Sequence, residues 1–224
     1  MTHELKKRIT TSTFLFVIAI FCIFFHRTIF SISVLLILFI SYREWSKMNY
    51  KYFYKKKSSI NDPYIIVKIL GFSYLILVFY SALFLRDQNK FYFMIILLIC
   101  IFSDIGGYVF GKIIGGKKLT RISPNKTVSG SAGSFAFSLI PLILFSFQNY
   151  VLIDLNFSLK NILFCLVISL SCQIGDLIIS FFKRLNKVKN TGNILPGHGG
   201  LLDRIDGIIF VLPTIYILKI IDIF

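Results

Sequence analysis

Acidic and charged residues are scarce in this sequence. Only 10 of its 224 residues are Asp or Glu, against 25 Lys or Arg, and charged residues make up 16% of the chain. Soluble globular domains are about 25% charged and close to half apolar, whereas 56% of this chain is hydrophobic. The composition therefore excludes an ordinary soluble domain and leaves little chain for a separate soluble unit.

Cysteine patterns that bind metals or form disulfide frameworks are also missing. The four cysteines lie inside apolar runs, with no CxxC pair and no His at ligand spacing. This pattern excludes a zinc site and predicts that the cysteines pack in the core. They are Cys22, Cys100, Cys165 and Cys172. No small-residue cleavage site follows the first apolar run, so we expect an uncleaved first span rather than a signal peptide.

What the sequence does contain is a series of long apolar runs. A helix needs about 20 mostly apolar residues to cross a bilayer, so we predict an all-α, polytopic transmembrane helical bundle with about seven spans. The predicted spans are residues 11–26, 28–42, 64–85, 91–114, 131–149, 159–182 and 206–222. Residues 43–63, rich in Tyr and Lys, are predicted to form a basic interfacial loop.

The chain divides into two predicted regions, N-terminal transmembrane helices with a basic cytoplasmic loop (1–90) and a catalytic transmembrane region (91–224). Most of the 25 basic residues fall on one side of the seven spans. The positive-inside rule places that side, and the N-terminus, in the cytoplasm. Because these basic residues lie between apolar spans, they argue for anionic lipid and against nucleic acid as the partner.

Asp176 interrupts an otherwise apolar span, as does Asp104. A carboxylate in a span costs several kcal/mol (~3) and is usually paired, hydrated or functional. Asp176 shares a helical face with a polar stripe that ends in two cations. The stripe is Gln173, Asp176, Ser180, Lys183 and Arg184. We predict that this face lines a hydrated cavity near the cytoplasmic surface; a structural polar contact between helices is the alternative.

A glycine-rich segment follows at residues 195–207. Closely spaced glycines let backbone amides approach an anion, although the segment lacks the P-loop pattern. Asp203 and Asp206 are oxygen ligands of the kind that Mg²⁺ prefers, and Arg204 offers a bidentate phosphate contact. His198 is a candidate proton carrier or phosphate donor, with a purely structural role equally open.

A second basic loop, rich in Gly and Ser, spans residues 122–133 and offers Lys126 as a phosphate contact. A ladder of small residues precedes it, and such ladders more often mark a close helix–helix contact than a ligand site. The ladder is Ser103, Gly107, Gly111 and Gly115. We therefore predict helix packing for the ladder and substrate contact for the loop.

The C-terminal third resembles the signature of the phosphatidate cytidylyltransferase family. The matching residues are Ser180, Lys183, Arg184, Lys189, Gly192, Pro196, His198, Gly199, Gly200, Asp203, Arg204 and Asp206. Similarity extends to Asp176 and to the Ser123-Pro124-x-Lys126-Thr127 segment. Asn190 stands where the signature has Asp, and Ser129 where many relatives carry Glu or Gln. Asn190 keeps an oxygen ligand and loses a charge, which leaves a non-catalytic relative as an alternative.

The resemblance implies transfer of a cytidylyl group from CTP to phosphatidic acid, with Mg²⁺ (or Mn²⁺) as cofactor. We expect the protein in a bacterial inner membrane, with its active site facing the cytoplasm. A homodimer is left open. The implied catalytic residues are Asp176, Asp203, Asp206, Lys183, Arg184 and His198, the first three as metal ligands. The implied substrate-binding residues are Ser123, Lys126, Thr127, Ser180, Lys189, Gly199, Gly200 and Arg204. Alternatives are a CTP-dependent lipid-alcohol kinase and an ion-coupled transporter.

Overall fold

The computed structural model describes residues 3–54, 63–120, 123–124, 126–146, 156–195 and 199–223. Its helices are α1 (His3–Phe24), α2 (Arg27–Tyr54), α3 (Pro63–Gln88), α4 (Lys90–Ile113), α5 (Val128–Ser138), α6 (Ile140–Ser146), α7 (Leu159–Leu185), α8 (Leu202–Ile205) and α9 (Ile208–Ile220). Across these ranges there is no strand, and only two isolated bridges join loop residues: Lys118 with Thr127 and Leu195 with Gly199.

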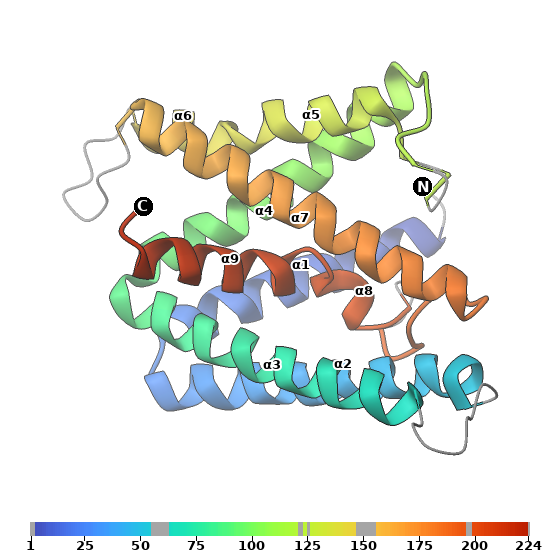
Figure 1. Cartoon of the computed structure of the whole chain (residues 1–224). Helices are drawn as coiled ribbons and strands as arrows, with labels where there is room; N and C mark the ends of the chain where they lie inside the picture. Colours follow the sequence, from blue (N-terminus) through green and yellow to red (C-terminus); the bar gives the residue numbers. More distant parts are fainter. Residues whose placement is uncertain are drawn as a thin grey trace.

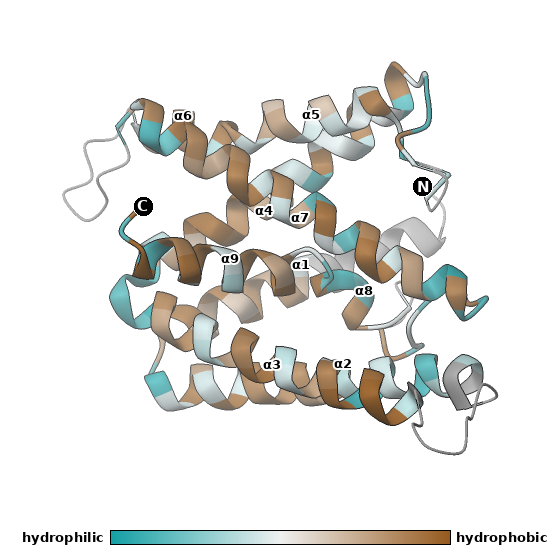
Figure 2. Ribbon diagram, in the orientation of Figure 1, coloured by the Kyte–Doolittle hydropathy of each residue, from teal (hydrophilic) through white to brown (hydrophobic). Residues whose placement is uncertain are grey.

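Five helical segments are long and apolar enough to cross a membrane by length and composition. They are Arg27–Tyr50, Tyr64–Gln88, Lys90–Ile113, Val128–Ser146 and Leu159–Leu185, and two shorter apolar helices are Thr13–Phe24 and Ile208–Ile220. Hydrophobic residues cover much of the length of the helices, and hydrophilic residues gather toward several helix ends and loops (Figure 2). The prediction of an all-α membrane bundle is confirmed.

The bundle packs consecutive helices against one another and also brings α9 against α3, which is distant in sequence. α2 and α3 run together along one edge, α4 packs closely on α5, and α9 lies between α3 and α7 (Figure 1). α7 also contacts α4 and α5. The helices of the second half of the chain thus pack on one another, with α3 in contact with α9 and α2 in contact with α7 and α8.

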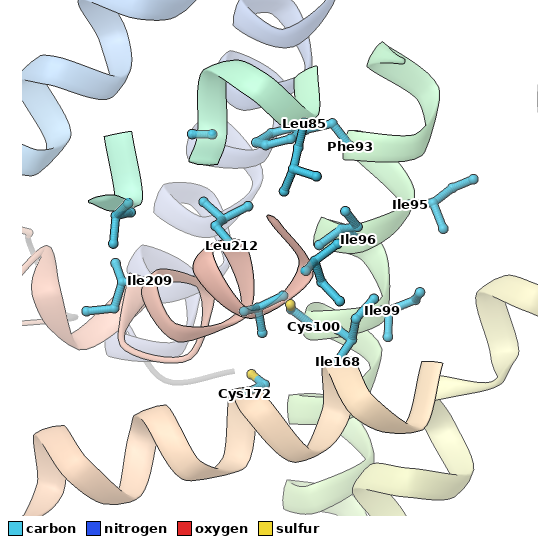
Figure 3. Packing of buried hydrophobic residues seen from close by; sticks show 14 of the residues in the cluster. Leu85, Phe93, Ile95, Ile96, Ile99, Cys100, Ile168, Cys172, Ile209 and Leu212 are labelled. Atoms are coloured by element: carbon cyan, nitrogen blue, oxygen red, sulfur yellow. The ribbon is translucent and has the colours of Figure 1, made fainter. Parts of the chain in front are cut away.

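The core lies where α4, α7 and α9 meet. Ile96, Ile99, Ile168 and Cys172 are buried there, close to Cys100 (Figure 3). Apolar residues from three helices interlock at this point, and their burial is the main favourable contribution to packing inside the bundle. The core position predicted for the cysteines is confirmed. Cys100, Cys165 and Cys172 are buried, and Cys22 packs at the edge of the core; all four are free thiols.

The predicted basic loop at 43–63 is wrong for its first part, because α2 continues to Tyr54. The residues that end the apolar run are polar and yet buried: Glu44 and Asn49 are 4% and 0% exposed. Asn186, just past the end of α7, donates a hydrogen bond to the Asn49 side chain at 2.9 Å. Contacts with the end of α7 thus hold these polar residues in a helix that hydropathy alone would end. Residues 55–62 lie outside the described chain.

The small residues of α4 form the close helix contact predicted for them. A side chain at Gly107 would collide with Ser134, and one at Gly130 would collide with the backbone of Gly107. Ser103 extends the contact to α7 by hydrogen-bonding Ser169 at 2.8 Å. Gly115 differs from the prediction, because α4 has already ended and Gly115 takes a positive φ of 64° in the following turn.

A buried arginine of α3 lies against the turn that joins α1 to α2. Arg86, 4% exposed, donates hydrogen bonds to the carbonyls of Ile23 and Phe25 at 3.1 and 2.6 Å. Its guanidinium also lies over the Phe30 ring, 5.4 Å from the centroid. The last carbonyls of a helix lack intrahelical donors, so Arg86 supplies donors where α1 ends and fixes the α1–α2 turn to α3.

Arg86→Leu is therefore expected to destabilise the protein. Two main-chain carbonyls lose a charged donor, which costs about 2–3 kcal/mol and corresponds to about 5–10 °C in Tm. Thermal unfolding of the purified protein in detergent measures the loss. Arg27→Leu is the matched control, because Arg27 is 68% exposed and pairs only with Asp87; a similar loss in both variants would contradict the role given to Arg86.

Candidate active site

The two polar segments predicted to act together line one cavity of ≈ 450 Å³ between α4, α5, α7 and the α8–α9 segment. Eight predicted site residues line it: Ser123, Lys126, Thr127, Asp176, Lys183, Asp203, Arg204 and Asp206. Asp104, Gln173 and Asn190 complete its polar wall. The structure thus gathers acids and bases from two distant segments of the chain into a single cavity.

An ion pair joins the two segments across the cavity. Lys126, in the loop before α5, pairs with Asp176 of α7 at 2.5 Å. The other oxygen of Asp176 accepts a hydrogen bond from Ser180, one turn along α7, at 3.2 Å. Ser180 does not itself line the cavity, and its observed contact orients the Asp176 carboxylate.

A second ion pair is more deeply buried. Lys183 donates to Oδ1 of Asp203 at 2.8 Å, and the Asp203 side chain is only 7% exposed. Oδ2 of Asp203 accepts the backbone amides of Thr191 and Gly200 at 2.9 and 3.2 Å. Both oxygens of this carboxylate therefore serve contacts within the chain. Asp203 therefore links α7 to the backbone at Thr191 and at Gly200.

Glu44 of α2 also binds the chain near Asp203. Its carboxylate accepts the backbone amides of Leu201 and Leu202 at 3.0 and 2.9 Å. It also accepts the hydroxyl of Thr191 at 3.0 Å. Side chains at Gly192 or Gly200 would collide with this carboxylate, so glycine is needed there for close approach. We use the name Glu44 clamp for Glu44 together with its three partners, Thr191, Leu201 and Leu202.

Backbone amides of the glycine-rich segment donate to acceptors within the chain, among them the carboxylates of Asp203 and Glu44. Gly200 donates to Asp203, and Gly199 exchanges hydrogen bonds with the backbone of Leu195 at 2.8 and 3.1 Å. In this structure each of these two amides has an acceptor within the chain, and the substrate contact predicted for Gly199 and Gly200 stays a prediction. Their contribution is to shape the loop, and Gly199 takes a positive φ of 92° to do so.

Thr127 begins α5 in addition to lining the cavity. Its hydroxyl accepts the backbone amide of Gly130 at 3.0 Å, which is the N-cap contact of α5. Its neighbours Lys126 and Val128 bond back to Leu119 and Lys117, so the loop is closed on itself. The cap thereby fixes the position from which Lys126 reaches Asp176.

Some predicted site residues lie elsewhere. Arg184 and Lys189 are exposed and do not line the cavity. Arg184 follows Lys183 directly, so the helix turns it away from the face that Lys183 occupies. His198 lies outside the described residues. The roles given to Arg184 and Lys189 are not supported by their positions in this structure.

The carboxylates fit a divalent cation only in part. Among the residues the structure describes, no three His, Cys, Asp or Glu side chains are grouped to hold a metal ion. Asp203 already uses both oxygens, whereas Asp176 and Asp206 line the cavity with Asp104. Mg²⁺ commonly needs only one or two carboxylates, with substrate phosphates and water as its other ligands.

Sequence reasoning missed Glu44 as a site residue. The only available signal was a carboxylate at the end of an apolar run, in a chain with ten acids. The partners of Glu44 are about 150 residues away and are mostly backbone amides, which no sequence motif records. Asp104 was noted as an intramembrane acid, but nothing in its own segment linked it to Asp176.

Comparison with known proteins identifies a family and several relatives that this chain resembles in sequence. A family model described as "Cytidylyltransferase family" matches residues 55–221. Proteins named phosphatidate cytidylyltransferase from Staphylococcus saprophyticus and Staphylococcus haemolyticus are 42% and 41% identical, each over 67% of this chain and 55% of the relative. The protein of that name from Staphylococcus aureus is 45% identical over 60% of this chain and 51% of the relative.

The chain spans about half the length of the curated relatives it matches. The matched region nevertheless contains both polar segments, the cavity that they line and the whole signature. The family model covers well over half of the chain, and therefore the chain belongs to the cytidylyltransferase family.

Proposed function

We propose that this protein transfers the cytidylyl group of CTP to phosphatidic acid, forming CDP-diacylglycerol and pyrophosphate. The observation that carries the proposal is the cavity whose wall contains three cations and three acids, which are Lys126, Lys183, Arg204, Asp104, Asp176 and Asp206. Cations suit phosphate groups, and carboxylates suit a divalent ion bound to those phosphates. The names of the staphylococcal relatives support the same substrates.

In the proposed reaction a phosphate oxygen of phosphatidic acid attacks the α-phosphorus of CTP. A new P–O bond forms, the bond to the β-phosphate oxygen breaks, and pyrophosphate leaves with that electron pair. The nucleophile is already an anion, so the site needs positioning and charge neutralisation rather than a strong base. Lys126, Lys183 and Arg204 supply that neutralisation along the wall of the cavity.

The two cations held by ion pairs are positioned before substrate arrives. Asp176 holds Lys126, and Asp203 holds Lys183. An incoming triphosphate competes with Asp176 for Lys126, which releases that carboxylate for a cation. We propose Asp176 and Asp206 as the ligands of Mg²⁺, with Mn²⁺ as a substitute. A bound divalent ion would neutralise the triphosphate and favour departure of pyrophosphate.

We further propose that the active site faces the cytoplasm of a bacterial inner membrane. The basic residues between the spans support this orientation by the positive-inside rule. CTP is cytoplasmic, and phosphatidic acid would enter from the bilayer. Span count, orientation and membrane follow from charge and hydropathy, and accessibility labelling of single cysteines in intact cells tests them.

The purified protein, incubated with phosphatidic acid, Mg²⁺ and CTP labelled on the cytosine ring, is expected to place label in the lipid phase and to release pyrophosphate. Removal of metal with EDTA should abolish the reaction, and Mg²⁺ should restore it. Label entering lipid only from the γ-phosphate would instead identify a lipid kinase. No lipid label from either form would reject nucleotide-dependent lipid modification.

Metal binding has a readout that does not depend on turnover. With a non-hydrolysable CTP analogue, Mn²⁺ should bind to the wild-type protein, as seen by electron paramagnetic resonance of the free ion. Asp206→Asn should weaken that binding about tenfold or more, because an anionic oxygen is lost. Unchanged Mn²⁺ affinity would remove Asp206 from the proposed ligands.

A further inference from the structure

A second cavity, whose lining is mostly apolar but includes three cations, lies on the far side of the Glu44 clamp from the active site. Its volume is ≈ 600 Å³, and it opens between α2, α3 and residues 191–194. Three cations line it: Arg43 and Lys47 from α2, and Lys68 from α3. Nothing in the proposed reaction uses these side chains.

The three cations have no acidic partner in the described part of the chain. None of them is in an ion pair, and the nearby carboxylate of Glu44 is engaged by the clamp. Arg43 and Lys47 are four residues apart on one helical face, where like charges repel. Arg43 and Lys68 instead lie over the rings of Phe39 and Tyr64, both at 5.9 Å. An anion in the cavity would relieve this excess positive charge.

A buried hydroxyl points to a ligand at the same place. Ser46 lines the cavity, and its side-chain oxygen is buried with no hydrogen-bond partner among the described residues. Buried polar groups are normally paired, and an orphan costs about 1–3 kcal/mol. A ligand with acceptor oxygens would pair with the three cations, and a rotation of the Ser46 side chain toward the cavity would let its buried hydroxyl donate to the same ligand.

The surroundings favour a lipid over a soluble anion. Lys68 emerges from the lipid-facing side of α3, where Ile65, Ile66 and Ile69 are exposed. A lysine at that depth keeps its ammonium group at the membrane surface while its stem lies along apolar side chains. Phospholipid phosphates occupy this level of a bilayer, and anionic lipids attract clusters of basic residues there.

We propose that this basic cavity binds the phosphate headgroup of an anionic membrane phospholipid. The bound headgroup would contact Arg43, Lys47, Lys68 and the hydroxyl of Ser46. Because Thr191 and Gly192 line this cavity while Asn190 and Asp203 line the active site, the lipid rests against the back of the clamped segment. The inference goes beyond the proposed catalytic reaction and does not depend on it.

The single tryptophan provides the measurement. Trp45 lies on α2 between Arg43 and Lys47 in sequence and lines the neighbouring apolar cavity, so it reports brominated lipid at this end of α2, and the variants below assign the signal to the three cations. The protein is placed in phosphatidylcholine vesicles that contain a small fraction of dibrominated phosphatidylglycerol or of dibrominated phosphatidylcholine. Quenching of Trp45 is expected to show about fivefold preferential binding of the anionic lipid. Equal quenching by the two lipids would overturn the proposal, whether or not the protein turns over CTP.

Matched variants separate a defined site from general surface charge. The triple variant Arg43→Gln, Lys47→Gln, Lys68→Gln should lose the preference. The control Lys112→Gln, Lys117→Gln, Lys118→Gln removes the same charge from side chains that do not line this cavity and should keep it. Ser46→Ala, which changes no charge, should weaken it. Equal losses in the two triple variants would overturn the proposal, as would displacement of the lipid by excess inorganic phosphate.

Discussion

Asp176→Asn is expected to reduce cytidylyl transfer by about a thousandfold while leaving the protein folded. The variant keeps the size of the side chain and its contact with Ser180, but it removes the negative charge that pairs with Lys126. It also removes a proposed anionic ligand of the divalent ion, whose stabilisation of the transition state is worth several kcal/mol (~4). Initial rates of lipid labelling from CTP measure the loss.

The Asp176 variant differs from the corresponding change at Asp203. Because Asp203 accepts Lys183 and two backbone amides, Asp203→Asn should lower Tm as well as activity. Asp176→Asn should lower activity with little change in Tm, since Asp176 is 35% exposed. Asp222→Asn, an exposed carboxylate near the C-terminal end of the described chain, serves as the control and should keep full activity. Substantial turnover by Asp176→Asn would refute the role proposed for this carboxylate.

Much of the fold was readable from the sequence because apolar runs of span length leave few alternatives. The errors fell where polar residues are buried. α2 runs to Tyr54 rather than ending at residue 42, since Glu44 and Asn49 make contacts with distant segments. Hydropathy treats such residues as the end of a span and has no means of seeing the partner that buries them.

The sequence predicted which residues lie together at the cavity better than it predicted their contacts. Spacing on one helical face correctly grouped Asp176 with Lys183, and both line the cavity. The same reasoning included Arg184, which is exposed, because a run of two cations cannot share one face. Three glycines close to two acids suggested a phosphate cradle, yet the amide of Gly200 donates to Asp203 and that of Gly199 to the carbonyl of Leu195. A sequence shows that amides are free to bind an anion but not which anion reaches them.

Glu44→Gln is expected to lower kcat by about a hundredfold and to change the KM for CTP only a few-fold. One oxygen of Glu44 accepts Leu201 and the other accepts Leu202. Whichever way the glutamine amide is turned, its NH₂ group faces a backbone N–H, so one buried donor loses its acceptor. The segment that carries Asp203 and Arg204 then shifts, and a displacement of about 1 Å in a catalytic group costs about a hundredfold.

Thr191→Val provides the graded comparison for this positioning role. It removes the hydroxyl contact with Glu44 at 3.0 Å but keeps both amide contacts and the amide that Thr191 gives to Asp203. Its kcat should therefore fall only a few-fold. Rates are measured below the Tm of each variant, so that unfolding does not enter the comparison. Wild-type kcat in Glu44→Gln would show that the active-site segment holds its position without this carboxylate, and an equal loss in Thr191→Val would assign the effect to the hydroxyl instead.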